Sequence, residues 1–398
     1  MKKINPYIIL VTVSIIVVLF YQFKWSLLYP RLSASMTITI VILVVLCWVF
    51  SLMFNSFIKY EKDTKWSLEY NYWYTLIVLI VALGTLMDGI YSHGFPLFGA
   101  IKYGDNYGIP TLHTFIAILD SYITYVLALM ATFNKSKRKI TIFAFTIAAI
   151  CLVLPLSRML IVLTFSNYLW SYLYLNLDRY KNIKFIQKLS LCILIICGMY
   201  IFGLLGNYRT NIQESNNKSY TDSTMIYQIG VPSTNFINSH IPAPFFWDYI
   251  YGTSALANLQ NIINERGRSE NTSLSEFAIT QFLPDVFGKN INNSEYENIK
   301  SSTYQYQVSP VLNVSTFLFK PYYLLGWFGI IAMIIFVLIF PVLYLLILNT
   351  LESNYIIIGI SILNTIYAFM FFDNMFTISV LSLQLLLPVI QGKISGNK

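Results

Sequence analysis

The sequence predicts an all-α polytopic integral membrane protein with about ten transmembrane helices and one large outer loop that contains short helices. Composition is the first observation behind this class: 56% of the 398 residues are hydrophobic and only 11% are charged. Soluble domains carry about 25% charged residues. A chain of this length buries a sufficient core without such an apolar excess, so the surplus surface faces lipid. The composition therefore excludes a soluble enzyme, a nucleic-acid-binding protein and a secreted disulfide scaffold.

The second observation is a series of apolar segments close to the length of about 20 residues that a helix needs to cross a bilayer. Ten such segments cover roughly residues 7–23, 36–58, 72–91, 112–133, 139–156, 158–177, 189–206, 322–348, 354–372 and 374–390. Only Asp373 separates the last two, which indicates a tight hairpin or a broken helix. The chain thus divides into a first bundle of about seven helices (1–206), a large loop (207–321) and about three C-terminal helices (322–398).

The lysines and arginines predict the orientation, because cytoplasmic loops of membrane proteins are enriched in both. With the N-terminus inside, 15 of the 26 fall in short cytoplasmic segments, and the short outer segments hold only Lys24, Arg31, Lys102 and Arg158. Both termini are therefore expected in the cytoplasm. The first apolar segment is similar to a signal peptide, but it has no clear cleavage site and is expected to remain as the first helix.

The loop 207–321 carries nine acids and seven bases and is rich in aromatic and amide side chains. The apolar spacing predicts a helix from Tyr249 to Ile262, and the stretch SLSEFAITQFLPDVFG predicts a helix, a stop and a turn. Asn216–Ser223 and Asn290–Ser302 are expected to be mobile loops. Aromatic rings and amides suit a sugar ligand, and a structured plug over the helices is the alternative.

Two arginines stand out by position. Arg158 lies among apolar residues, where a charge is costly and usually faces a cavity or a partner, and Arg209 follows the seventh apolar segment directly. Arginine binds phosphate oxygens by bidentate hydrogen bonds that lysine does not match. As alternatives, Arg158 extends to the interface or pairs structurally with Asp120 or Asp88, and Arg209 is an ordinary interfacial cation.

Histidines and acids on the outer side are candidates for a general base. His113 lies where a Gly- and Pro-rich loop, residues 92–111, re-enters the membrane, and a neutral imidazole accepts a proton from a hydroxyl. Asp105, Asp248 and Glu276 are the alternative bases, and His240 is a further outer-side histidine; lone residues of these kinds are more often structural or solvated. No nucleotide-binding or metal-binding spacing occurs, so neither a cofactor nor a metal is expected.

The whole arrangement resembles the Wzy-type O-antigen polymerases, the oligosaccharide repeat-unit polymerases of Gram-negative bacteria. About ten spans, cytoplasmic termini and one late periplasmic loop carry the likeness over nearly the full chain. Local matches are GFPLFG and YGIPTLHTF within 94–115, LSRMLIVL at 156–163, GNYRTN at 206–211 and YIYGTSALANLQ at 249–260.

This resemblance implies a glycosyl transfer on the periplasmic face of the inner membrane. The substrate is an oligosaccharide on undecaprenyl pyrophosphate, and the growing chain moves from its lipid to the new repeat unit. In this reading Arg158 and Arg209 stabilise the pyrophosphate, and His113 or an outer acid acts as the base. Arg266 and Arg268 are alternatives for sugar or phosphate contact, and Asp105, Asp248, His240 and Glu276 are further candidates for substrate binding. The resemblance also implies a flippase and a separate chain-length regulator as partners.

Other classes remain open. An O-antigen ligase shares the outer loop and the outer arginines, so sequence separates it poorly from a polymerase. A lipid-linked oligosaccharide flippase has similar hydropathy but needs no large outer loop. A membrane O-acetyltransferase is disfavoured because all three histidines lie on the outer side.

Overall fold

The computed structural model describes residues 4–58, 66–98, 107–176, 185–215, 219–269 and 272–396. In these ranges the regular structure is helical, apart from one isolated bridge between Ser26 and Pro232. The longer helices are α1 (Pro6–Tyr21), α2 (Ala34–Phe57), α3 (Tyr72–Tyr91), α4 (Leu112–Phe133), α5 (Arg138–Val153), α6 (Arg158–Leu175), α8 (Phe185–Ser215), α11 (Phe245–Asn264), α13 (Asp285–Tyr304), α15 (Trp327–Leu348), α16 (Ser353–Phe369) and α18 (Leu386–Gly396). The short elements are η1 (Pro96–Phe98), α9 (Thr224–Gly230), α10 (Thr234–Ile237), α12 (Leu274–Phe282), α14 (Phe319–Leu325), α17 (Ser379–Ser382) and η2 (Leu383–Leu385).

Every expected apolar segment contains a helix, and the all-α membrane class is confirmed at that level. Within the described ranges five helical segments are long and apolar enough to cross a bilayer: Ala34–Phe57, Tyr72–Tyr91, Leu112–Phe133, Leu189–Ile212 and Trp327–Leu348. Helices α1 and α16 are apolar but shorter, and the last expected segment is a broken helix made of α17, η2 and α18. The structure therefore supports a helical membrane protein without fixing ten spans.

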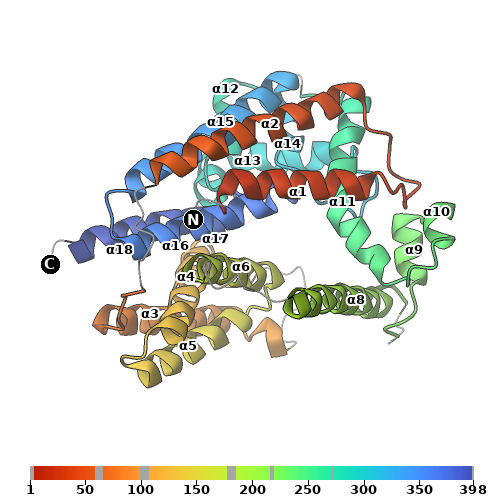
Figure 1. Ribbon diagram of the computed structural model, residues 1–398. Coiled ribbons are helices and arrows are strands. Elements are labelled where there is room, and N and C mark those ends of the chain that lie inside the picture. The colour runs from red at the N-terminus through yellow and green to blue at the C-terminus, as the bar shows by residue number, and fades with distance from the viewer. Residues whose placement is uncertain are drawn as a thin grey trace.

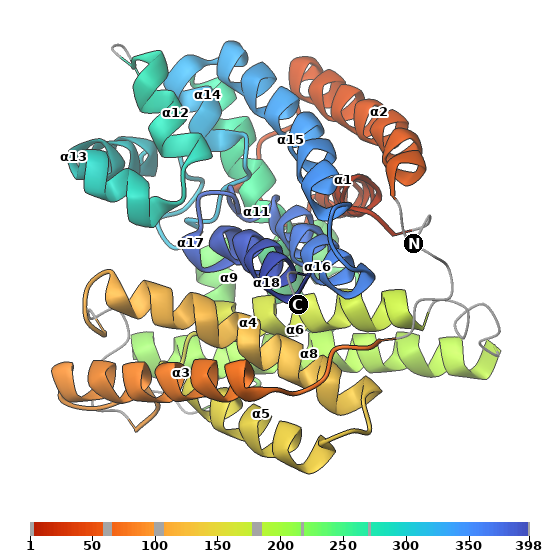
Figure 2. The ribbon, with the colours of Figure 1, turned by 90° about the vertical axis from the view of Figure 1, so that its left-hand side faces the viewer.

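The helices form two groups joined through α16 (Figures 1 and 2). One group contains α1, α2, α11 and α15, and the other contains α3, α4, α5 and α6. Helix α16 packs against α1 on one side and α6 on the other, and α17 packs against α4. The C-terminal helices therefore lie between the groups and connect them.

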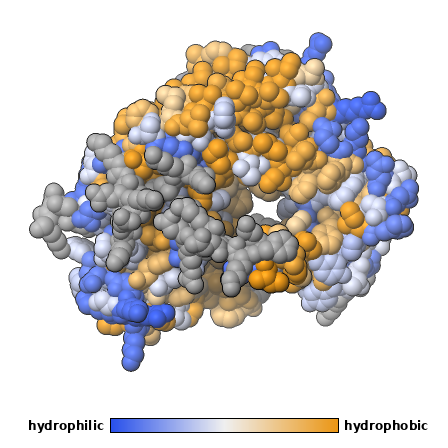
Figure 3. Space-filling model, viewed as in Figure 1, coloured by the Kyte–Doolittle hydropathy of each residue, from blue (hydrophilic) through white to orange (hydrophobic). Residues whose placement is uncertain are grey.

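Apolar side chains cover much of the outer surface, above all over the region of α2 and α15 (Figure 3). Ile38, Trp48 and Ile331 are each more than half exposed, as are Leu83 and Leu194 in other helices. A contiguous exposed apolar surface of this kind fits a lipid environment and would cause aggregation in water. Hydrophilic residues gather at the margins of this view, near α9 and α10 and at the opposite lower corner.

A proline inside α15 is accommodated by two tyrosines. Pro341 has no N–H, so the carbonyl of Val337 one turn earlier lacks its helical partner. The hydroxyl of Tyr367 in α16 donates a hydrogen bond to that carbonyl, and the hydroxyl of Tyr7 in α1 donates to the neighbouring carbonyl of Leu338 at 2.5 Å. In lipid a freed backbone carbonyl must be satisfied by such a neighbour, so Pro341 is a point where α1, α15 and α16 are held together.

Polar residues also link α4, α6 and the C-terminal helices. The Gln384 amide donates to the Ser121 hydroxyl at 2.9 Å, and Ser121 lies 2.7 Å from the hydroxyl of Thr164 in α6. Asn167 donates to Gln384 at 3.1 Å, and these side chains are buried. Interhelical hydrogen bonds of this kind fix which helices associate when the surrounding solvent is lipid.

The segment expected as the large loop is mostly helical. Helix α8 runs through the expected boundary at residue 206 to Ser215, and the helix predicted over Tyr249–Ile262 is confirmed as α11. The predicted helix and stop in SLSEFAITQFLPDVFG are confirmed as α12 and Leu283–Pro284, but a helix follows in place of the turn. Residues 219–223 are irregular, and 216–218 lie outside the described residues.

The loop predicted for Asn290–Ser302 is wrong, because this stretch belongs to α13. Its composition is polar, and only Ile299 and Thr303 within its second half are buried. Ile299 packs with Phe277 of α12 and Leu324 of α14. Tertiary contact with these two helices, which the local sequence does not reveal, stabilises the helix.

The eighth expected span is interrupted near its beginning. Gly326 has φ of +61° and separates α14 from α15, a conformation that glycine adopts without a steric penalty. A Cβ at this position would lie 2.7 Å from the guanidinium of Arg268. At this break α14 packs back against the beginning of α15, and Lys320 of α14 lies beside Asp373 in the chain that follows α16.

Candidate functional site

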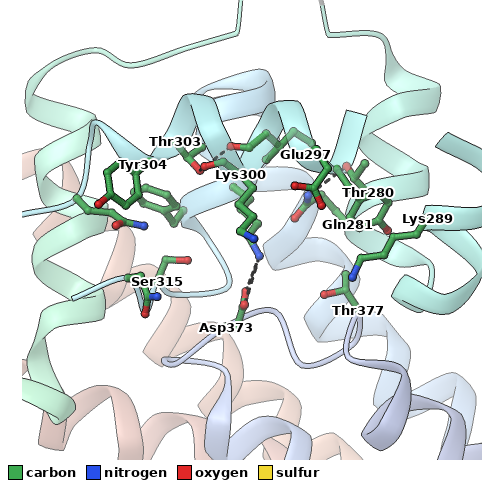
Figure 4. A pocket seen from close by; sticks show the side chains of 16 residues that line it. Thr280, Gln281, Lys289, Glu297, Lys300, Thr303, Tyr304, Ser315, Asp373 and Thr377 are labelled. Atoms are coloured by element: carbon green, nitrogen blue, oxygen red, sulfur yellow. Dashed lines mark hydrogen bonds and ion pairs between the residues drawn. The ribbon is translucent and has the colours of Figure 1, made fainter. Parts of the chain in front are cut away.

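A polar cavity of about 390 Å³ lies between α12, α13 and α14 and the loop after α16 (Figure 4). In this view Thr303, Lys300 and Glu297 of α13 lie above it, and Asp373 lies below. We call this cavity the polar pocket. Its lining residues are Thr280, Gln281, Lys289, Tyr296, Glu297, Ile299, Lys300, Thr303, Tyr304, Gln307, Asn313, Ser315, Phe319, Lys320, Asp373 and Thr377.

Helix capping positions the upper wall. Ser273 and Glu276 form a capping box that begins α12, with the Glu276 carboxylate accepting from the Ser273 N–H at 2.7 Å. Pro284 ends this unit, and α13 begins at Asp285. Tyr296 in α13 donates to the Ile279 carbonyl in α12 at 3.2 Å, and burial together with nearby Asp285 raises the pKa of Tyr296 to about 12. Its hydroxyl therefore stays protonated and keeps its hydrogen bond to the Ile279 carbonyl.

The lower wall is fastened to the beginning of α13. The Asp285 N–H donates to the Thr377 carbonyl at 2.7 Å, and the Asp285 carboxylate accepts from both the N–H and the hydroxyl of Ser379. Asn374 donates to the Gln281 carbonyl at 2.7 Å. These bonds join α12 and α13 to a segment about 90 residues further along the chain, so the pocket exists only in the folded protein.

Three lysines give the polar pocket an excess of positive charge over its two carboxylates, Glu297 and Asp373. Lys320 donates to both oxygens of Asp373, at 3.1 and 3.2 Å. Lys289 lies 3.3 Å from Asp285. Lys300 is exposed, and the ion pairs of the described residues do not include it. A ligand with negative charge would find one unpaired ammonium and two others that can exchange partners.

Two glutamine oxygens in the polar pocket have unused hydrogen-bonding capacity. The Oε1 atoms of Gln281 and Gln307 are buried and have no hydrogen-bond partner among the described residues. An unsatisfied buried acceptor costs about 1–3 kcal/mol, a cost that a ligand hydroxyl removes by donating. Acceptors, hydroxyls, tyrosines and lysines together suit a polyhydroxylated ligand that carries negative charge.

His113 belongs to a second polar cluster, at the junction of α3 and α4. Its Nδ1 lies 2.8 Å from Oδ2 of Asp88, and the other oxygen of Asp88 accepts from the Ile109 N–H at 2.8 Å. The Tyr107 ring meets the imidazole edge-on at 5.2 Å between centroids. Asp88 is buried and His113 is about one third exposed. A carboxylate that orients an accessible imidazole is an arrangement that general bases use.

Arg158 is the first residue of α6 and is exposed. The turn before it contacts the Gly-rich loop through the Leu97 N–H, which donates to the Leu154 carbonyl at 3.2 Å. Arg158 therefore lies at the same end of the α3–α6 group as His113. The structural pairing with Asp88 or Asp120 is not found, because Asp88 binds Ile109 and His113, and Asp120 accepts from Thr124.

Arg209 is half-buried in α8, which packs against α9 and α11, whereas α6 packs against α4 and α16. The two arginines expected to share a pyrophosphate thus belong to helices with different neighbours. Arg266 and Arg268 lie in the turn after α11, where both are near Tyr322, and Arg268 donates to the Leu325 carbonyl at 3.3 Å.

The remaining predicted site residues are spread over the molecule. His240 is exposed in a turn with φ of +57° before α11, and Glu276 caps α12. Asp248 lies in the first turn of α11 beside a different cavity. Asp105 lies outside the described residues.

None of the described predicted site residues lines the polar pocket. A sequence signal for it exists in α13, where Tyr296, Lys300 and Thr303 recur at spacings of four and three residues. That spacing puts them on one face of a helix. Within the described residues no group of three or more His, Cys, Asp or Glu side chains is placed to hold a metal ion, and metal-free activity stays a prediction.

Comparisons of this chain with protein-family models, with curated proteins and with solved structures find no match. The fold itself defines the class: a helical membrane protein with a folded helical segment between its apolar helices.

Proposed function

We propose that this chain is a surface-polysaccharide polymerase, a glycosyltransferase of the bacterial inner membrane. It joins oligosaccharide repeat units carried on undecaprenyl pyrophosphate and releases undecaprenyl pyrophosphate. The polar pocket is the observation that carries the proposal. Its lysines suit the phosphate groups of such a substrate and its unpaired amide oxygens suit sugar hydroxyls, while the apolar helices of the chain suit the lipid.

The reaction is a substitution at the anomeric carbon of the growing chain. The bond from this carbon to the pyrophosphate oxygen breaks, and the oxygen keeps the electron pair. A hydroxyl of the new repeat unit forms the new bond and gives its proton to a base. Cations near the leaving group stabilise its developing charge. Pyrophosphate leaves readily when stabilised in this way, so the proposal requires neither a metal nor a cofactor.

Residue roles follow from position. His113 is the proposed base, since Asp88 orients its imidazole and one third of its side chain is accessible. Arg158 lies at the same end of the helices and is the proposed cation nearest this base. Arg209, Arg266 and Arg268 are proposed for contacts with the lipid-linked phosphate or the sugars, and Lys300 and Lys320 join them from the polar pocket.

The proposed topology has ten spans, both termini in the cytoplasm and residues 207–321 in the periplasm. The distribution of lysine and arginine supports it. Its partners are a flippase that supplies the substrate and a regulator that sets chain length. Cysteine labelling from outside the cell at Ser301, in α13, and at Ser136, in the turn before α5, tests this topology: only the cysteine in place of Ser301 should react.

Deletion of the gene followed by gel analysis of lipopolysaccharide tests the function. A polymerase deletion should leave the lipid core bearing a single repeat unit. Deletion of a ligase or a flippase would leave the core alone, and that result would overturn the proposal in favour of one of these classes. Complementation with Arg158→Ala and Arg209→Ala should fail to restore long chains at normal protein level. If both variants restored long chains, these arginines would not be part of the active site.

A further inference from the structure

A second cavity, of about 220 Å³, lies where the end of α1 meets α8 and the beginning of α11. The residues that line it are mostly aromatic: Phe20, Phe23, Trp25, Met199, Ile241, Phe245, Asp248 and Tyr249. We call this cavity the aromatic pocket. It shares no lining residue with the polar pocket.

The aromatic rings hold one another in place. The Phe23 and Trp25 centroids are 5.1 Å apart, and the Trp25 and Tyr249 centroids are also 5.1 Å apart. The backbone N–H of Trp25 donates to the Tyr249 hydroxyl at 3.1 Å, and the backbone carbonyl of Trp25 accepts from the Ser233 N–H at 2.7 Å. The wall is therefore formed before a ligand arrives, which lowers the entropic cost of binding.

Asp248 is the single acid in this lining, and its Oδ2 atom is buried without a hydrogen-bond partner among the described residues. Burial raises the pKa of this carboxyl to about 7. Among the described lining residues the other titratable group is Tyr249, and burial raises its pKa to about 12. Lys24, between two lining residues in sequence, is exposed. Within the described part of the chain the ionised carboxylate thus has no counter-charge, and burying it alone is costly.

We propose that the aromatic pocket binds an ammonium group. The faces of Trp, Tyr and Phe rings attract cations, and an ammonium N–H would satisfy Oδ2 of Asp248 and compensate its charge. A neutral hydroxyl would supply the hydrogen bond but leave the charge uncompensated. Met199 brings α8 to the pocket, and the neighbouring Ile195, Ile196 and Phe202 of α8 expose apolar side chains, so a ligand can enter from lipid.

Two sources supply this chemistry: the head group of an aminophospholipid and an amino sugar of a glycan. The site is separate from the proposed transfer reaction and does not depend on it.

Binding of methylammonium, a small cation with N–H donors, to the purified full-length protein in detergent tests the inference. Methylammonium chloride should raise the unfolding temperature relative to equimolar sodium chloride, because a ligand that binds only the folded state stabilises it. Asp248→Asn should weaken this binding by about tenfold, the order expected for a partly desolvated cation contact, as should Trp25→Leu. Glu265→Gln, which changes an exposed acid at the other end of α11, should bind as the unaltered protein does.

Asp248→Asn removes an unpaired charge and keeps the side-chain shape, so it should fold even if Trp25→Leu does not. Nanodiscs of phosphatidylethanolamine compared with phosphatidylglycerol test the lipid source, and glucosamine compared with glucose tests the sugar source. Protection by either amine that depends on Asp248 supports the inference and identifies the source. Equal effects of methylammonium and sodium, or unchanged binding in Asp248→Asn, would overturn it, whatever the outcome of the gene deletion.

Discussion

Lys320 in α14 donates hydrogen bonds to both carboxylate oxygens of Asp373, at 3.1 and 3.2 Å, and so links α14 to the loop after α16. Both side chains are about one third exposed. A pair in contact with water contributes little to stability, typically up to about 1 kcal/mol. The ion pair matters because of its position: Lys320 lines the polar pocket, and Asp373 neutralises its charge there.

Asp373→Asn should therefore strengthen the binding of inorganic pyrophosphate, because the substitution frees Lys320 for the ligand. Lys320→Met should weaken binding by about tenfold, as expected for one charge-assisted hydrogen bond to a phosphate. Calorimetric titration of the purified protein measures both. Lys393→Met, an exposed cation near the end of α18, is the control and should leave affinity unchanged. Identical affinities in the three variants would show that the polar pocket does not bind pyrophosphate.

His113→Gln should abolish long polysaccharide chains while leaving the protein level unchanged, because the imidazole is partly exposed and its loss opens no core cavity. Asp88→Asn should also lower stability by about 1–3 kcal/mol, since buried Asp88 accepts hydrogen bonds that an amide cannot fully replace. Gel analysis of lipopolysaccharide measures the length of the polysaccharide chains, and immunoblotting measures the protein level. His240→Gln, an exposed histidine, should keep the full ladder. A normal ladder with His113→Gln would contradict the assignment of the base.

The apolar helices and α11 could be predicted because their own side chains carry the pattern. Leu256, Leu259 and Ile263 recur at helical spacing and are all buried in the core. Helix α13 gives no such signal: the face formed by Tyr296, Lys300 and Thr303 lines a polar pocket and not a core. A polar stretch without apolar periodicity is typical of a loop. The helical spacing of its polar residues gains a meaning only once the pocket that they line is known.

The site was harder to predict for a related reason. Arg158 stands out in the sequence because apolar residues surround it. Lys320 and Asp373 do not stand out, because they lie 53 residues apart and meet only in the folded protein. In sequence Asp88 is a candidate partner of Arg158, yet in the structure it binds His113. A chain's local context identifies chemically capable residues, whereas their partners depend on tertiary contacts.

Gly203→Ala should destabilise the protein by about 1–3 kcal/mol, the cost of overpacking a close contact. A Cβ at this position in α8 would lie 2.1 Å from the carbonyl oxygen of Pro244, which cannot move without shifting the beginning of α11. Gly198→Ala in the same helix is the matched control, because no atom lies within 4 Å of its Cβ position. It should stabilise α8 by up to about 1 kcal/mol. Equal stability of the two variants in thermal unfolding would contradict the packing of α8 on α11.

Asp248 should make stability depend on pH. Its pKa of about 7 in the folded protein lies above the usual value of 3.8, so the folded state holds this proton more tightly than the unfolded state does. The resulting stabilisation is complete below about pH 4 and is lost as the pH rises through about 7. The unfolding temperature should thus fall less between about pH 5 and about pH 8 in Asp248→Asn than in the unaltered protein. Glu265→Gln should follow the unaltered protein, and parallel curves for all three would show that Asp248 is not desolvated.

Tyr367→Phe should lower the free energy of unfolding by about 1–3 kcal/mol, because it removes the only donor that replaces the N–H missing at Pro341 and leaves the Val337 carbonyl unsatisfied within the described bundle. The ring and its packing against Tyr7 and Phe376 are kept, so the loss reports the hydrogen bond alone. Tyr72→Phe, at an exposed ring, should be neutral. Replacing Pro341 by Ala in the Tyr367→Phe background should recover most of the loss, since Ala restores the helical N–H to Val337. If this double variant were no more stable than Tyr367→Phe, the tyrosine would not be compensating for the proline.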